Sequence, residues 1–469
     1  MIATERAAPA ATVFASFCAD LRWDRLPEAA RARTAELVLD LLGVATRGSA
    51  AGSSRAVQAV VATQPRGSAT VIGGSVPTSV GGTASPLRST AAWAALANGA
   101  SAHAIEMDDV TTESSLHPGA AVIPAALAVA QERSAPGLSA LEAIVAGYEV
   151  TMRVGNALGA ASAYRRGFHP TGVAGVFGAA VAAGKVLGLD AQGLERAIGI
   201  AGTMASGSLE YLADGSWTKR LNPGWAAHGG IVAASLAAAG FTGPRTAIEG
   251  EHGLLRGYTD APDPTRLLEG LSTGDLQVMH VSIKPYGCCR YAHGIIDAVL
   301  ALKKDHGLSP DDVAEMRLGV LTAGWPLIAE PAERVKAPRN VVDAQFSAPY
   351  AAAVALARGR AGLAEFGDDA LRDPTVRALT ARSECVADPS LDAEYPRRWP
   401  AAVEIRLRDG RVLRHRIEHA LGEPENPVPR DALVARFVEM TGRPNGREIA
   451  ERILTLHAEP DLRVLDELA

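Results

Sequence analysis

The sequence has few of the features that mark a secreted, membrane-spanning or nucleic-acid-binding protein. Four cysteines in 469 residues are too few for a disulfide framework at this length. A formal net charge of −6 argues against general nucleic-acid binding, which needs a basic face. The apolar runs at 119–130, 171–184 and 230–241 are shorter than the ~20 residues of a membrane-spanning helix. With no signal-peptide pattern at the N-terminus, we expect a cytoplasmic protein without nucleic-acid or membrane partners.

Recognised metal and phosphate motifs are also missing. There is no HExxH sequence, and the adjacent Cys288 and Cys289 match no zinc spacing. The segment from Gly178 to Lys185 resembles a phosphate loop only superficially. Five residues separate its glycines, and Val186 stands where a Ser or Thr would hold magnesium. The sequence therefore gives only a weak signal for a metal site and no phosphate loop.

What the chain does contain is a long series of small-residue helical patterns. Hydrophobic content of 48% and charged content of 21% are ordinary for a soluble globular protein of two or three domains. Helical spacing of Ala, Val, Leu and Gly predicts helices over 10–46, 87–104, 119–131 and 138–158. The stretch 168–230 is the richest in Ala and Gly, which allow close helix approach, and we expect it to form a buried helical centre.

Strand patterns are confined to the later part of the chain. Alternating residues predict a strand and a domain boundary within 274–289, a strand at 316–321, and a hairpin over 402–419 that turns at Asp409-Gly410. Strands in one late segment favour separate α and α+β units. We expect a mostly α protein with a helical domain at 1–277, an α+β domain at 278–420, and C-terminal helices at 421–469 that return to the helical domain.

Several polar residues in the helical part could carry chemistry. His103, Glu106, Asp108 and Asp109 crowd three carboxylates and an imidazole at one predicted helix end, which suits acid/base work or metal binding but also a solvated acidic loop. His117 and His169 each precede a proline, which places them at loop–helix junctions, where a histidine can face a cleft or cap a helix.

Two further groups of residues are candidates. A polar loop carrying Lys219 and Arg220 precedes a helix predicted near Pro223, and such a loop beside an apolar centre could bind an anion or simply be solvated. Cys289 and His293 closely follow Lys284. A cysteine near these groups could exchange protons, or it could be a small buried apolar residue.

In motif order and spacing, the sequence resembles the MmgE/PrpD superfamily, and the resemblance covers nearly the whole chain. The segments that carry it are Leu39–Gly43, Asn98–Asp109, His117-Pro118, Gly147–Glu149, Phe168–Pro170, Lys219 with Asn222–Gly229, Lys284–Tyr286, Phe346–Tyr350 and Gly422–Pro427. The resemblance implies a homodimer with a large all-helical domain and a smaller α+β lid. It also implies an active site between the two domains that needs no metal or organic cofactor.

The resemblance also implies a set of site residues. The catalytic positions would be Glu106, His117, His169, Lys219, Cys289 and Tyr350. Substrate-binding positions would be His103, Asp109, Arg220, Lys284 and His293. All of His103, Glu106, His117, His169 and Lys219 lie at predicted helix ends, and all but Glu106 are cationic or can be. We therefore predict that they come together although they are distant in sequence.

The chain departs from the family pattern at several of these positions. Glu106 stands where the family often has Asp, and Val110 stands where the decarboxylase and dehydratase motifs have Thr. The loop to His117 is one residue longer than in the decarboxylase, and Cys289 stands at a position that is His there.

We expect a cofactor-independent dehydratase acting on a small di- or tricarboxylate. An epimerase of an iminodisuccinate-like acid is the second alternative, and a cis-aconitate-type decarboxylase is the third. A metal-dependent lyase and a non-enzymatic helical scaffold are competing classes. A scaffold would give no clustering of His103, His117, His169 and Lys219.

Overall fold

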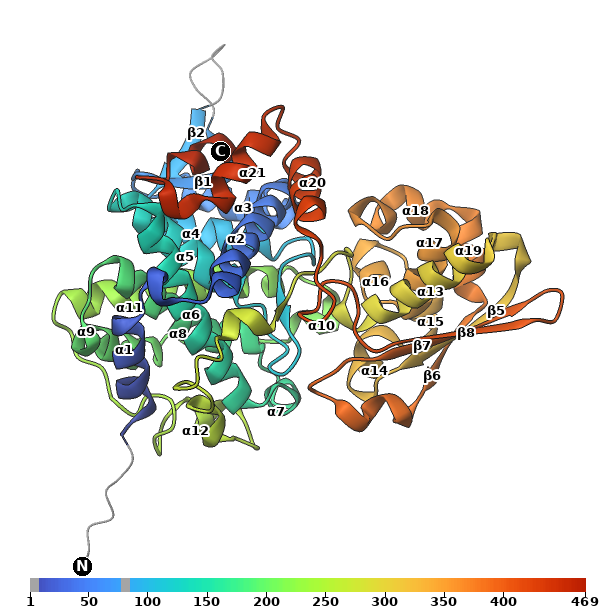
Figure 1. Cartoon of the computed structure of the whole chain (residues 1–469), viewed down its shortest axis with the longest axis horizontal. Helices are drawn as coiled ribbons and strands as arrows, with labels where there is room; N and C mark the ends of the chain where they lie inside the picture. The colour runs from blue at the N-terminus through green and yellow to red at the C-terminus, as the bar shows by residue number, and fades with distance from the viewer. Residues whose placement is uncertain (1–7, 77–84) are drawn as a thin grey trace, which may run out of the picture. The chain divides into compact units, whose positions relative to one another are not determined.

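A computed structural model describes residues 8–76 and 85–469 (Figure 1). Residues 1–7 and 77–84 lie outside this description. The Gly, Ser and Pro residues before residue 86 predict an irregular connection, and most of it falls in the second of these gaps. The described residues form two compact units, one of residues 8–76, 85–281 and 429–469 and one of residues 282–428. The mostly α fold with a smaller α+β part is confirmed.

The larger unit is a stack of helices, with α8 (Pro170–Val186) at its centre. Helix α8 packs against α5 (Gly119–Glu132), α6 (Gly137–Leu158), α9 (Ala191–Ala201) and α11 (Thr218–Ala238). Every residue of α8 from Pro170 to Gly184 is buried. A helix that is apolar on all sides belongs in the interior of a large unit, so the predicted buried helical centre is confirmed for α8. It is wrong for residues 212–218 of the same stretch, which are exposed.

The remaining elements of this unit surround that centre, and those labelled η are short 3-10 helices. They are α1 (Ala10–Asp20), η1 (Trp23–Arg25), α2 (Glu28–Gly48), α3 (Gly52–Val61), the antiparallel pair β1 (Ala69–Val76) and β2 (Ser85–Ser89), α4 (Ala91–Ala102), β3 (Val110–Thr111), α7 (Ala160–Arg165), α10 (Tyr211–Asp214), α12 (Leu254–Tyr258), η2 (Pro264–Leu267), η3 (Gln277–His280), α20 (Arg430–Thr441), α21 (Gly446–Leu454), η9 (Leu456–Ala458) and η10 (Arg463–Leu468).

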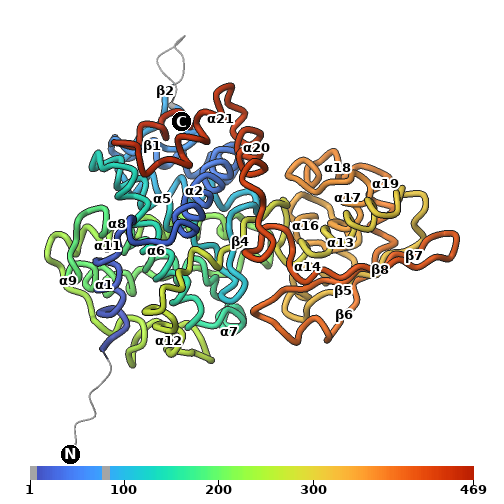
Figure 2. The backbone as a smooth tube through the Cα atoms, viewed as in Figure 1, coloured from blue at the N-terminus to red at the C-terminus, as the bar shows by residue number. Residues whose placement is uncertain are grey.

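The C-terminal segment belongs to the larger unit because α20 packs against α2. Figure 2 shows this red helix beside the blue one, although nearly four hundred residues separate them in sequence. The chain therefore leaves the helical unit after Val281 and returns to it at Pro429.

The smaller unit is built on a four-stranded sheet in the order β6-β5-β7-β8. Strand β5 (Val313–Val320) pairs with β6 (Ser383–Ala387) in parallel and with β7 (Ala401–Leu407) antiparallel, and β7 forms a hairpin with β8 (Val412–Ile417). Helices α13 (His293–His306) and α17 (Ala348–Arg358) pack on it. The alternating burial of β7 matches the apolar positions from which we predicted the hairpin.

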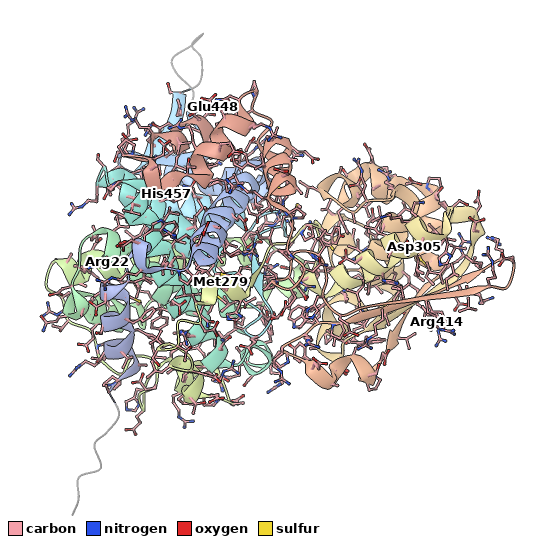
Figure 3. The ribbon with its side chains drawn as sticks, viewed as in Figure 1. Arg22, Met279, Asp305, Arg414, Glu448 and His457 are labelled. Atoms are coloured by element: carbon pink, nitrogen blue, oxygen red, sulfur yellow. The ribbon has the colours of Figure 1, made fainter. Side chains whose placement is uncertain are left out.

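Short helices complete the smaller unit. They are η4 (Arg290–Ala292), η5 (Pro310–Asp312), η6 (Thr322–Gly324), α14 (Trp325–Ile328), α15 (Ala332–Lys336), α16 (Val341–Gln345), η7 (Leu363–Phe366), α18 (Asp368–Arg372), α19 (Pro374–Ala381) and η8 (Pro389–Glu394). Side chains fill the spaces between the ribbons of both units (Figure 3).

Some element boundaries differ from those predicted. The helix expected over 10–46 is broken at 21–27, where Pro27 is the N-cap of α2 and lies before its first turn. The strand expected within 274–289 is reduced to β4 (Val281–Ser282), because the preceding Val and Met residues lie in η3. Short apolar runs do not distinguish a strand from a helical turn.

The start of α11 was also predicted wrongly. The helix begins at Thr218, so Lys219 and Arg220 lie in its first turn, whereas the sequence predicted a polar loop. Proline favours the first helical turn, which suggested a start near Pro223. The helix instead includes Pro223 in its interior and forgoes one backbone hydrogen bond there.

Close contact between α4 and α11 requires glycine at position 224. A Cβ atom added there would lie 2.2 Å from the carbonyl oxygen of Leu96. We predict that Gly224→Ala lowers the free energy of unfolding by about 1–3 kcal/mol, because the two helices must move apart. Gly257→Ala is the matched control, since a Cβ atom in α12 would have no neighbour within 4 Å. Urea unfolding that gave the two variants equal stability would contradict this packing.

Candidate active site

The candidate site lies in the helical unit, around the loop that joins α4 to α5. His103 is the C-cap residue of α4, and His117 lies two residues before α5. His169 is the N-cap residue of α8, and Lys219 lies in the first turn of α11. Four helix ends therefore supply these side chains, as the sequence predicted.

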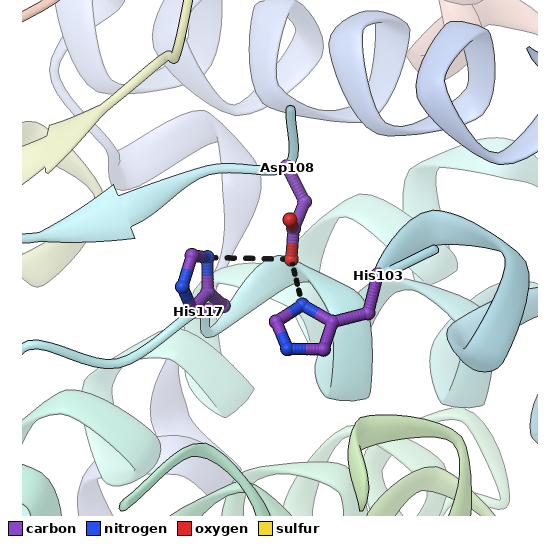
Figure 4. A group of neighbouring side chains, drawn as sticks. All are labelled: His103, Asp108 and His117. Atoms are coloured by element: carbon purple, nitrogen blue, oxygen red, sulfur yellow. Dashed lines mark hydrogen bonds and ion pairs between the residues drawn. The ribbon is translucent and has the colours of Figure 1, made fainter. Parts of the chain in front are cut away.

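Asp108 connects two of the histidines. One oxygen of its carboxylate, Oδ2, lies 2.6 Å from Nδ1 of His103 and 3.3 Å from Nδ1 of His117 (Figure 4). Nδ1 of His117 also lies 2.6 Å from the backbone carbonyl oxygen of Asp109. Carbonyl and ionised carboxylate oxygens only accept hydrogen bonds, so Nδ1 carries the proton in both rings. In a neutral ring, Nε2 then carries the lone pair.

His169 has the opposite arrangement. Its Nδ1 lies 3.1 Å from the side-chain nitrogen of Asn222, which is a donor. Nδ1 of His169 therefore accepts, and the proton of the neutral ring is on Nε2. Burial lowers the pKa of His169 well below its ordinary value, and the neighbouring His103, Lys219 and His117 lower it further. The ring is thus a neutral hydrogen-bond donor.

The three rings are close together. The ring centroids of His103 and His117 are 4.8 Å apart, and those of His103 and His169 are 5.6 Å apart. His103 is fully buried, and its Nε2 has no hydrogen-bond partner among the described residues. The structure therefore brings together two rings that present a lone pair and one that presents an N–H.

A cation and a carboxylate lie beside these rings. Lys219 donates a hydrogen bond to Glu106, and both side chains are largely buried. Glu106 has a φ of 58°, a left-handed conformation that costs a residue with a Cβ atom about 1 kcal/mol or more. Arg220 donates to the Ser53 hydroxyl at 3.2 Å. Burial lowers the pKa of Arg220, and the negative charge of Glu106 opposes that shift.

Asp109 lies next to Asp108 in sequence but has a different environment. Its carboxyl group accepts hydrogen bonds from the Tyr148 hydroxyl at 2.7 Å and from the Gly119 backbone at 3.1 Å. Burial is the main cause that raises its pKa to about 8, despite the opposing hydrogen bond from Tyr148. Neighbouring carboxyl groups in one loop thus have different roles, and Asp109 holds the backbone that carries His117.

The other predicted site residues belong to the α+β unit. Lys284 and His293 are buried, and Nε2 of His293 lies 3.3 Å from the carbonyl oxygen of Cys288. Cys289 is 7% exposed. The Tyr350 hydroxyl donates to the backbone carbonyl of Glu365 at 2.9 Å, and burial raises the pKa of Tyr350. Their roles in a site stay predictions.

Several residues that hold the site had no role predicted from the sequence. Asp108 was noted only as one of three crowded carboxylates, although it orients two histidines. Asn222 fixes the tautomer of His169, and its position three residues after Lys219 on α11 could have suggested it. Tyr148, buried within α6, had no polar pattern that would have revealed its bond to Asp109.

Two groups in the described chain have ligand atoms close enough for a metal ion. In the site, atoms of His103, Asp108 and His117 lie within 4.8 Å of one another, and His419, Glu423 and Glu425 form such a group in the smaller unit. In the first group, the imidazole nitrogens that face Asp108 carry protons in the hydrogen-bonding pattern described above. A metal ion bound at those nitrogens would have to displace both protons, whereas Nε2 of each neutral ring keeps a lone pair.

Asp109 predicts a specific pH dependence of stability. Its pKa is raised to about 8 in the folded protein and is about 3.9 when unfolded. Between these values the folded state holds a proton that the unfolded state lacks, so this group makes stability fall as pH rises, by at most about 1.4 kcal/mol per pH unit.

We therefore predict that Asp109→Asn loses less stability than the wild type between pH 5 and 8 in urea unfolding. Asp369→Asn is the control, because the side chain of Asp369 is 99% exposed. Parallel pH profiles for the wild type and Asp109→Asn would contradict the assigned environment.

No helix of the described residues is long and apolar enough to cross a membrane.

Comparison with curated proteins finds relatives along most of the chain. Cis-aconitate decarboxylase from Aspergillus terreus (strain NIH 2624 / FGSC A1156) is 28% identical over 96% of this chain and 94% of its own length. The human cis-aconitate decarboxylase is 28% identical over 74% of this chain and 71% of its own length. The mitochondrial 2-methylcitrate dehydratase of Yarrowia lipolytica is 31% identical over 24% of this chain and 21% of its own length.

Family models match both parts of the chain. The model of the MmgE/PrpD N-terminal domain matches residues 12–267, and that of the C-terminal domain matches residues 286–461. The first range contains His103, His117 and His169, and the second contains the whole four-stranded sheet. The resemblance noted in the motifs is thereby confirmed, and the chain belongs to the MmgE/PrpD family.

Proposed function

We propose that this protein is a lyase that acts on a small di- or tricarboxylate by removing a proton next to a carboxylate. The observation that carries the proposal is the opposed protonation of the histidines. His117, held by Asp108 and the Asp109 carbonyl, presents a basic Nε2, whereas the neutral His169 presents an N–H. A positioned base beside a hydrogen-bond donor and a cation suits carbanion chemistry.

In the proposed reaction, His117 takes the proton from the carbon next to the carboxylate. The electrons of the broken C–H bond form the new double bond, and the hydroxyl group leaves the neighbouring carbon as water with that proton. The Lys219 ammonium and the Nε2–H of His169 stabilise the negative charge that develops on the substrate carboxylate. This is the dehydration that we expected from the sequence.

Decarboxylation is the second candidate, because the decarboxylase from Aspergillus terreus matches this chain over 96% of its length. The same groups could serve that reaction. Loss of carbon dioxide would break a C–C bond and leave the electron pair on carbon, and a protonated His117 would then supply the proton. In dehydration the site takes a proton from the substrate carbon. In decarboxylation it gives a proton to the carbon that has lost carbon dioxide.

The two candidates are separated by incubating the protein with 2-methylcitrate or cis-aconitate in deuterated water. A dehydratase forms an alkene from the hydroxy acid without gas release, whereas a decarboxylase releases carbon dioxide from cis-aconitate. The epimerase would be favoured if an iminodisuccinate-like acid exchanged the proton next to its carboxylate for deuterium, with inversion at that carbon and without forming an alkene. Activity lost on exhaustive chelation and restored by one divalent ion would favour a metal-dependent lyase. No turnover of any of these acids would contradict the proposal.

We predict that Lys219→Ala lowers kcat by roughly 10²–10³-fold, because the ammonium that meets the developing charge is lost. The change also leaves Glu106 without its ammonium partner. The double variant Lys219→Met/Glu106→Gln is therefore measured in parallel, because it removes both charges of the pair. Lys304→Ala, exposed on α13, is the control and should retain wild-type kcat. Full activity of folded Lys219→Ala would show that the site is assigned wrongly.

A further inference from the structure

The motif Leu39–Gly43 was part of the family resemblance but has no place in the chemistry above. It lies on α2, and a Cβ atom at Gly43 would be 3.2 Å from the ring of Phe437. Glycine at this position therefore lets α20 approach α2 closely. Asp40, one turn earlier on the same helix, is largely buried beneath α20. The motif thus forms the surface on which the C-terminal segment docks.

Arg436 on α20 connects that surface to the active-site loop. Its Nη2 lies 3.2 Å from Oδ1 of Asp40, and it donates to the backbone carbonyl of Met107 at 3.1 Å. The Arg436 side chain is 13% exposed and that of Asp40 is 2% exposed. A guanidinium group can bind both acceptors at once because its N–H donors are fixed in one plane.

The Met107 carbonyl occupies a sensitive position. It belongs to the peptide group that joins Met107 to Asp108, whose carboxylate contacts the Nδ1 atoms of His103 and His117. Glu106, immediately before it, has a φ of 58°, and Ser115 further along the loop has a φ of 48°. Left-handed backbone at such residues persists only where the surroundings hold it. A hydrogen bond to this carbonyl supplies such a restraint.

We propose that Arg436, held by Asp40, is a positioning residue that fixes the Met107–Asp108 peptide group and thereby the two histidines that Asp108 orients. This inference rests on the proposed function for its effect on turnover, but not for its effect on the histidine rings. A displacement of about 1 Å in a catalytic group is enough to change rates by about 10²-fold. The C-terminal helix, far from the loop in sequence, becomes part of the active-site framework.

The test uses Arg436→Gln, the conservative Arg436→Lys, and Asp40→Asn in the full chain. The matched control is Arg430→Gln, on the same helix, because the Arg430 side chain is half exposed and pairs with Glu451 on α21 at 3.7 Å. Kinetics use whichever of 2-methylcitrate and cis-aconitate the wild type converts. Circular dichroism and thermal unfolding show whether each variant is folded.

We expect kcat to fall roughly 10–100-fold in Arg436→Gln, with KM changed less than about threefold, and to recover in part in Arg436→Lys. The nitrogen resonances of the His103 and His117 rings, observed in ¹⁵N-histidine-labelled protein, should shift in Arg436→Gln and Asp40→Asn but not in Arg430→Gln. Wild-type kcat and unchanged ring resonances in folded Arg436→Gln would overturn the proposal. The proposal would fail equally if Arg436→Gln lowered the melting temperature but left kcat and the ring resonances unchanged.

The ring resonances separate this inference from the proposed function. If the wild type turned over none of the acids, the lyase proposal would fail, and the resonances would still decide whether Arg436 positions the histidines. If Arg436→Gln did not fold, Arg436→Lys and Asp40→Asn would carry the same test, because each retains a polar side chain at the contact. Unchanged resonances in both would overturn the positioning role.

Discussion

The geometry of the candidate site depends on one buried carboxylate, that of Asp108. Its Oδ2 lies 2.6 Å from Nδ1 of His103 and determines which nitrogen of that ring holds the proton. The same oxygen lies 3.3 Å from Nδ1 of His117, whose proton the Asp109 carbonyl accepts. His169 is set in the opposite sense by Asn222. Three chemically identical side chains therefore present different groups, and their difference comes from hydrogen-bond partners that lie behind them. Without Asp108, the His103 ring would be free to exchange tautomers.

The small-residue helices explain how these largely buried side chains can come together. Close packing of α4 against α11 at Gly224 brings the end of one helix near the start of the other, so His103 and Lys219 enter the same region. The loop between α4 and α5 is then held from several sides, by Tyr148 through Asp109 and by Arg436 through Met107. Contacts from neighbouring helices thus restrain a loop that contains left-handed residues.

The sequence predicted the helical centre, the late hairpin and the convergence of His103, His117, His169 and Lys219, because helical spacing and histidine–proline pairs are local signals. It did not reveal the roles of Asn222, Tyr148 and Arg436. Their partners lie 53, 39 and 329 residues away, and a polar residue within a helix gives no sign of which distant group it will meet. The start of α11 was missed for a different reason, since Pro223 is tolerated inside the helix.

The central claim is that the histidines have opposed tautomers, and nitrogen NMR of the ¹⁵N-histidine-labelled protein tests it most directly. The chain has 11 histidines, so single His→Gln variants assign the resonances of His117 and His169. Near neutral pH, the account predicts a neutral His169 with its proton on Nε2 and a His117 with its proton on Nδ1. A doubly protonated His169, or the same tautomer in both rings, would contradict it.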